Sequence, residues 1–331
     1  MPTLYLLEQG AKLEKESKRL VVTKEGKILL EIPEFKIERV FIFGNIQITT
    51  PAMKFLLERG IETGLFTVYG RLIGKLSPVS SKNVLLRLSQ FEKAKDEEFK
   101  LRMAKVIIEG KIKSTKVLLQ RFARNHPEVD FKEAEESLNS CLGELPRKTK
   151  VSGVIGIEGR ASAIYFEAFG KMFRKELKFE RRTRRPPKDP VNSLLSLGYS
   201  LITNEMFSVL ESMGFDPYVG YLHGIEYGRP SLALDLIEEF RHIVIDRLTL
   251  ELVNKEILTS DDFEERGEGV YLKEKARKKY FLHYEKRMLT SFQSPFSGEG
   301  EVTYRKMFYQ QAQRFSKTIK EDIPYTPFSI R

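Results

Sequence analysis

Several features that define other protein classes are scarce or missing in this chain of 331 residues. It has one cysteine, Cys141, and no tryptophan. A single cysteine excludes an intramolecular disulfide and a zinc site built from cysteines. No apolar run approaches the roughly 20 residues that a membrane-spanning helix needs, and the first residues do not have the pattern of a signal peptide. We therefore expect a soluble, cytoplasmic protein without a membrane partner.

The chain also has fewer acidic than basic side chains. It contains 56 lysine and arginine residues against 46 aspartate and glutamate residues, which gives a formal net charge of +10. This balance favours a polyanionic partner, although many soluble proteins are mildly basic without one. The abundance of lysine and glutamate is compatible with a thermophilic source.

Length and pattern predict two domains, because a chain of this size can bury two cores. Residues 1–78 consist mainly of short apolar runs separated by turn signals, which predicts a small β-rich domain. The turn signal Lys24-Glu25-Gly26 predicts a hairpin with the glycine at positive φ. This domain has no cluster of histidine or acidic residues, so a role as scaffold or dimer interface is favoured over catalysis.

The second domain follows a break in this pattern. The stretch Ser77-Pro78-Val79-Ser80-Ser81 is rich in proline and serine, and we place a linker at residues 79–82. Over residues 83–331, apolar side chains recur at three- and four-residue spacing, which predicts helices. The predicted fold is therefore α+β and multidomain, with a small N-terminal β-rich domain followed by a larger all-α domain.

Residues 220–241 are the most informative stretch of the second domain. They start with a glycine-rich turn that contains His223. Arg229-Pro230-Ser231 predicts the start of a helix, because proline suits the first turn and serine can cap it. From Leu232 onward the predicted helix is apolar on most sides, which indicates burial, and we expect it to continue to about Val253.

Three carboxylates nevertheless lie on this predicted buried helix. Asp235, Glu238 and Glu239 fall within an arc of roughly 100° at helical spacing. Carboxylates that share one side of a buried helix repel each other and lose hydration, so they persist where cations neutralise them. A divalent metal is one such cation, and the loop can deliver His223 as a nitrogen ligand.

The same carboxylates can also be neutralised without a metal, and the residues alone leave this open. Arg229 or Arg241 can pair with them, and acids near a helix start also favour the macrodipole. His242, four residues after Glu238, lies on the same face and is either a rival ligand or a structural side chain.

Two further stretches contain charges in unusual surroundings. Glu158 lies among small and apolar residues, where a lone acid is structural more often than catalytic, and Arg160 beside it can contact phosphate or pair with a carboxylate. Prolines prevent a regular helix over residues 181–190. An exposed arginine loop of this kind suits phosphate contact better than base reading, and the alternative is a solvated surface loop. Its arginines are Arg181, Arg182, Arg184 and Arg185.

Three elements, in this order, carry a resemblance to a known family. They are Gly156-Ile157-Glu158-Gly159, Leu222-His223, and the stretch from Arg229-Pro230-Ser231-Leu232 to Arg241. Together they resemble the CRISPR-associated endonuclease and integrase family of spacer acquisition (Cas one). The resemblance implies that Glu158, His223 and Glu238 bind a divalent metal, that Asp235 is a catalytic acid close to it, and that Tyr199 and Arg241 lie near the substrate strand.

The resemblance also implies a reaction and partners. The expected reaction is metal-dependent phosphoryl transfer, with Mn²⁺ or Mg²⁺, on double-stranded or branched DNA and on fragments with 3′ overhangs. Residues 1–78 would form a homodimer, residues 83–331 would be catalytic, and a small ferredoxin-like partner (Cas two) would join the assembly. The alternatives are a non-catalytic architectural DNA-binding protein and a metal hydrolase of small phosphoesters.

Overall fold

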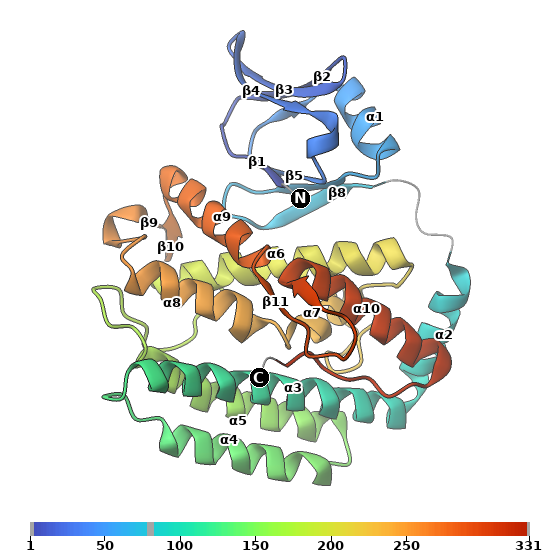
Figure 1. The fold of residues 1–331 in the computed structure, drawn as a ribbon, viewed down its shortest axis with the longest axis vertical. Coiled ribbons are helices and arrows are strands. Elements are labelled where there is room, and N and C mark those ends of the chain that lie inside the picture. Colours follow the sequence, from blue (N-terminus) through green and yellow to red (C-terminus); the bar gives the residue numbers. More distant parts are fainter. Residues whose placement is uncertain (1–2, 78–82, 330–331) are drawn as a thin grey trace. The chain divides into compact units, whose positions relative to one another are not determined.

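The chain forms two compact units in a computed structural model that describes residues 3–77 and 83–329 (Figure 1). The first unit ends at Ser80 and the second begins at Ser81. The predicted linker at residues 79–82 lies outside the described residues. Among the helices that the structure describes, none is both long and apolar enough to cross a membrane.

The first unit is β-rich, as the sequence predicts, and contains two four-stranded sheets in the orders β1-β5-β7-β8 and β4-β3-β2-β6. β3 and β4 form the predicted hairpin, and its turn residues Glu25 and Gly26 both have positive φ. One helix, α1 (Thr50–Glu58), begins after Thr49, whose hydroxyl accepts a hydrogen bond from the helix backbone. A short 3-10 helix covers Glu34–Lys36. The strands are β1 (Thr3–Leu6), β2 (Lys12–Glu16), β3 (Arg19–Lys24), β4 (Lys27–Pro33), β5 (Arg39–Phe43), β6 (Gln47–Ile48), β7 (Glu62–Phe66) and β8 (Leu72–Leu76).

The second unit is mainly helical. The helices α3, α4 and α5 pack side by side, and α6 packs against α7 (Figure 1). Short 3-10 helices cover Leu145–Arg147 and Ser260–Asp262. The helices are α2 (Val84–Lys95), α3 (Glu97–Asn125), α4 (Lys132–Glu144), α5 (Val151–Gly170), α6 (Pro190–Met213), α7 (Ser231–Ile237), α8 (Arg247–Asn254), α9 (Glu274–Met288) and α10 (Tyr304–Glu321).

The prediction of an all-α second domain was wrong in detail, because this unit contains two small hairpins. One pairs β9 (Phe263–Arg266) with β10 (Gly269–Leu272), and the other pairs β11 (Ser291–Gln293) with β12 (Glu301–Thr303). Gly267, at φ 56°, supplies the left-handed turn between β9 and β10. Strands of three or four residues are too short to show a period-two pattern in the sequence.

The helix predicted from Ser231 to about Val253 is also interrupted. α7 ends at Ile237, a π-helix covers Arg241–Asp246, and α8 follows directly. Ser231 does not cap α7, because its hydroxyl donates to the carbonyl of Gly224 at 2.8 Å. Single π-helical turns are rare and occur frequently at functional sites. The break between Ile237 and Arg241 is therefore a candidate position for a functional site.

Candidate metal centre and nucleic-acid interface

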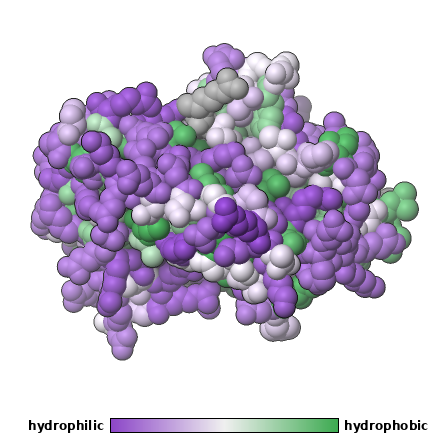
Figure 2. All heavy atoms as spheres, turned by 90° about the horizontal axis from the view of Figure 1, so that it is seen from below, coloured by the Kyte–Doolittle hydropathy of each residue, from purple (hydrophilic) through white to green (hydrophobic). Residues whose placement is uncertain are grey.

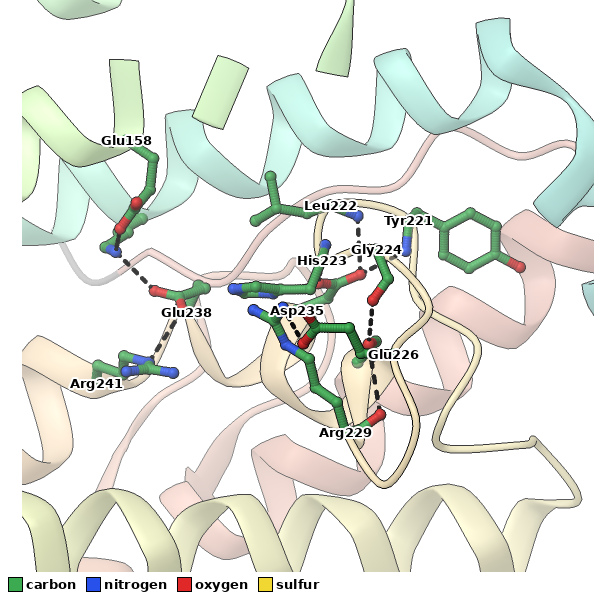
Figure 3. Close-up of polar contacts among 12 residues, drawn as sticks. Glu158, Tyr221, Leu222, His223, Gly224, Glu226, Arg229, Asp235, Glu238 and Arg241 are labelled. Atoms are coloured by element: carbon green, nitrogen blue, oxygen red, sulfur yellow. Dashed lines mark hydrogen bonds and ion pairs between the residues drawn. The ribbon is translucent and has the colours of Figure 1, made fainter. Parts of the chain in front are cut away.

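The structure brings together Glu158, His223 and Glu238, which come from α5, from the loop before α7 and from the end of α7 (Figure 3). The ammonium of Lys111, on α3, joins the two carboxylates. It forms a hydrogen-bonded ion pair with Oε1 of Glu158 and lies 2.9 Å from Oε2 of Glu238. Figure 3 shows the imidazole of His223 extending toward Glu238. Side chains from α3, from α5 and from the two segments that flank α7 thus meet in one place.

The loop that contains His223 is anchored by Asp235. This fully buried carboxylate accepts hydrogen bonds from the backbone N–H groups of Tyr221, Leu222 and His223 at 2.6, 3.0 and 3.0 Å. Its Oδ1 also lies 2.7 Å from Nδ1 of His223. A Cβ at Gly220 would lie 2.9 Å from Asp235, so only glycine lets the loop approach this closely.

The geometry therefore gives Asp235 a positioning role. A carboxylate on Nδ1 fixes the orientation of a histidine ring and leaves Nε2 as the nitrogen for a ligand. The oxygens of Asp235 are directed to the loop, so this residue acts through His223. The resemblance implies that Asp235 is a catalytic acid close to the metal; in the structure its carboxylate bonds to the loop and to the ring of His223.

Both glutamates are held in the ionised form. Burial alone would raise the pKa of Glu238, but the charges of Arg241 and Lys111 outweigh it and lower the pKa to about 2. Burial has the same effect on Glu158, and the ammonium of Lys111 overcomes both this and the repulsion from Glu238, so the pKa of Glu158 is also lowered. Two ionised carboxylates at neutral pH are ready ligands for a hard cation.

The residues present fit a divalent metal in their donor chemistry. The donors would be one oxygen from each of Glu158 and Glu238 and Nε2 of His223, a mixed set that suits Mn²⁺ or Mg²⁺. Oε2 of Glu238 is buried without a hydrogen bond of good geometry among the described residues. No group of three acidic, histidine or cysteine side chains in the described part of the chain is already close enough to hold an ion. The ammonium of Lys111 lies between the two carboxylates instead.

Two residues that the sequence associated with this site face elsewhere. Glu239 points to the C-terminal tail, where it accepts hydrogen bonds from the hydroxyl of Tyr325 at 2.5 Å and the backbone N–H of Phe328 at 2.6 Å. Because α7 ends before Glu239, the expected common face with Glu238 does not form. His242 is buried with its Nδ1 2.7 Å from Asp246, so it is a structural side chain and not a rival ligand.

Sequence reasoning did not single out Lys111. It lies four residues after Ile107 and four before Thr115, both of which are buried on α3. This places it on the inward face of the helix, and it is only 7% exposed. A lysine in the middle of an apolar stripe was the available signal, because such a charge needs a buried partner.

Tyr199 supports two arginines near this site. Its hydroxyl donates to Asp246 at 2.5 Å, and its ring lies 4.9 Å from the guanidinium of Arg241 and 5.4 Å from that of Arg182. Arg241 also contacts Glu238 at 3.1 Å. Since its hydroxyl is already bonded and buried, Tyr199 orients these cations and does not itself present a polar group to a strand.

The other candidate nucleic-acid residues divide into two kinds. Arg182 is packed into the fold, with hydrogen bonds to Asn192 at 2.7 Å and Ser196 at 3.1 Å, and Arg160 pairs with Glu144 at 2.6 Å. The remaining arginines of the loop at 181–190 are exposed, as expected for a phosphate-binding loop: Arg181, Arg184 and Arg185. Figure 2 shows that hydrophilic residues cover most of one face of the molecule.

Comparisons with known proteins identify relatives of this chain. A family model described as CRISPR associated protein Cas1 matches residues 4–286. A CRISPR-associated endonuclease Cas1 of Thermus thermophilus is 36% identical over 99% of this chain and 97% of its own length. One from Chlorobaculum tepidum is 33% identical over 99% and 98%.

Solved structures share the fold. A Cas1 protein from Thermotoga maritima superposes with a TM-score of 0.82 at 25% identity and covers the whole of both chains. A casposase bound to integration product has a TM-score of 0.87 at 23% identity, covering 99% of this chain and 93% of that one. The resemblance seen in the sequence is thereby confirmed: the chain belongs to the CRISPR-associated Cas1 family.

Proposed function

We propose that this chain is a metal-dependent DNA endonuclease and integrase that inserts DNA fragments as new spacers into a CRISPR array. The observation that carries the proposal is the convergence of Glu158, Glu238 and the oriented imidazole of His223 in one place. Relatives that match nearly the full chain are named as endonucleases, which supports the nuclease activity. The shared fold with a casposase bound to integration product is compatible with strand joining.

The mechanism follows from charge. Glu158, His223 and Glu238 would hold a divalent ion, which would supply Lewis-acid polarisation of a phosphodiester. In cutting, the attacking oxygen is that of water; in integration it is the 3′-hydroxyl of the incoming fragment, and in both a P–O bond of the attacked strand breaks. Asp235 holds His223 in one orientation. Arg241, supported by Tyr199, places a further positive charge beside the site to offset the charge that develops on the phosphate.

The direct test is incubation of the protein with branched and linear duplex DNA in the presence of Mn²⁺, Mg²⁺ or a chelator. We expect cut and joined products with a divalent ion and none with the chelator. One observation favours a non-catalytic architectural role, namely that Lys111 already pairs with both glutamates. Tight DNA binding without products under all three conditions would establish that second function and overturn the first.

The exposed loop arginines are proposed to bind DNA phosphates. Replacing Arg181, Arg184 and Arg185 together by alanine is expected to weaken binding about equally for all sequences. The slope of log affinity against log salt should fall by roughly 0.9 for each phosphate that the loop no longer neutralises. An equal loss of charge on exposed lysines of α10 is the control and should change the slope less; these are Lys306, Lys317 and Lys320.

The first unit is proposed to form a homodimer. β4 is the last strand of its sheet, and three consecutive apolar residues on it are exposed: Ile28 by 55%, Leu29 by 49% and Leu30 by 43%. An exposed apolar edge strand is a ready surface for pairing with a second copy. Leu29→Lys is therefore expected to shift the protein toward monomer in light scattering, whereas Ile73→Lys, on the other sheet, should not.

A small ferredoxin-like protein is proposed as a further partner. The support is that the whole of this chain matches part of a chain in a complex named for Cas1 and Cas2, at a TM-score of 0.83 and 26% identity. The matched chain is longer, since this chain covers 36% of it.

A further inference from the structure

Lys111 lies at the centre of the candidate metal site, where its ammonium pairs with both carboxylates. It belongs to the 29-residue helix α3 and follows Gly110, where an added Cβ would lie 2.6 Å from Pro327 of the C-terminal tail. The tail therefore packs directly on the backbone next to Lys111. A cation that takes the place of the ammonium must therefore break two ion pairs.

The charges around Lys111 balance without a metal. Two carboxylates, Glu158 and Glu238, face two cations, Lys111 and Arg241. A divalent ion bound by the same carboxylates would leave the group with an excess of two positive charges if both cations remained. Excess charge in a buried site is costly, so the ion and the ammonium oppose each other until an anion arrives.

We propose that Lys111 is a displaceable internal cation, which competes with the divalent ion for Glu158 and Glu238 and pairs with a DNA phosphate once it is displaced. The inference rests on the proposed function, because a nucleic-acid strand is the anion that would restore the balance. It makes metal and DNA binding cooperative: each ligand removes part of the cost of binding the other. By linkage, DNA must tighten metal binding by the same factor by which metal tightens DNA binding.

The test is the Mn²⁺ affinity of the full chain, measured by calorimetry without DNA and then with a saturating non-cleavable duplex. Lys111→Met is expected to bind Mn²⁺ about tenfold or more tightly than the wild type without DNA, since no buried ion pair must first be broken. DNA should tighten Mn²⁺ binding by the wild type roughly 5- to 150-fold, the usual range of such coupling, and by the variant much less.

Two further variants keep the result interpretable. Lys111→Gln retains a hydrogen-bond donor without the charge and serves if the methionine variant does not fold; it should behave in the same direction. Lys113→Met is the matched control, because Lys113 is exposed and pairs with Glu109 on the same helix, and it should match the wild type.

The outcomes separate this inference from the proposed function. Equal or weaker Mn²⁺ binding by the folded Lys111 variants, with the wild type binding normally, overturns the competition and leaves the nuclease proposal intact. If no form of the protein binds Mn²⁺ even with DNA, the proposed metal-dependent function fails, and the inference fails with it.

Discussion

Glu158→Gln and Glu238→Gln are each expected to lower metal-dependent DNA cutting by roughly 10²- to 10³-fold or more, the usual cost of removing one preorganised group that stabilises developing charge. The amide keeps the size of the side chain but removes the negative charge that would hold the ion. Both carboxylates have lowered pKa values, so the wild type presents two charges at neutral pH and each variant presents one. The measurement is single-turnover cutting of a branched duplex with Mn²⁺.

DNA binding in the presence of a chelator is the accompanying measurement. It should be almost unchanged in both variants, because the exposed arginines that are proposed to contact phosphate lie in a different loop. Glu226→Gln is the matched control: Glu226 lies in the loop before α7, pairs with Arg229 and is solvent-exposed. It should cut within about twofold of the wild type, as expected for a surface change. Normal metal-dependent cutting by both variants would show that these glutamates are not the ligands of the catalytic metal.

Local rules predicted the parts of the fold that depend on neighbouring residues. The hairpin at Gly26 follows from a glycine between two apolar runs, and both its turn residues have the positive φ that such a turn requires. Tertiary contacts decided the rest. Ser231 was expected to cap a helix, but its hydroxyl donates a hydrogen bond to the carbonyl of Gly224 in the loop. Only the tertiary structure brings this partner close.

The candidate site shows the same division. Asp235, Glu238 and Glu239 were found as acids on an apolar helix, but their directions depend on where α7 ends and on what surrounds it. Glu239 accepts hydrogen bonds from the C-terminal tail, which the sequence predicted only as a loop. The association of Glu158 with His223 came from family resemblance, because no periodicity connects residues on different elements. Lys111 was missed because its partners lie on two other helices.

Phe328→Ala is expected to destabilise the second unit by about 3–5 kcal/mol, the usual cost of truncating a buried phenylalanine. Phe328 is completely buried and stacks on Phe240 with the ring centroids 4.9 Å apart. Because Phe240 follows Glu238 by two residues, the cavity would open beside the turn that contains Glu238. The measurement is the free energy of unfolding from urea denaturation. Ile323→Ala, in the same tail but 46% exposed, is the control and should stay within about 0.5 kcal/mol of the wild type.

The same variant distinguishes a tail that only adds stability from one that also positions the site. The backbone of Phe328 holds Glu239, the neighbour of Glu238, and Pro327 packs on Gly110, the neighbour of Lys111. Loosening the tail should therefore weaken Mn²⁺ binding even under conditions where the variant remains folded. Unchanged Mn²⁺ affinity in a destabilised but folded variant would show that α3 and α7 hold these side chains without the tail. Unchanged stability would show that Phe328 does not belong to the core.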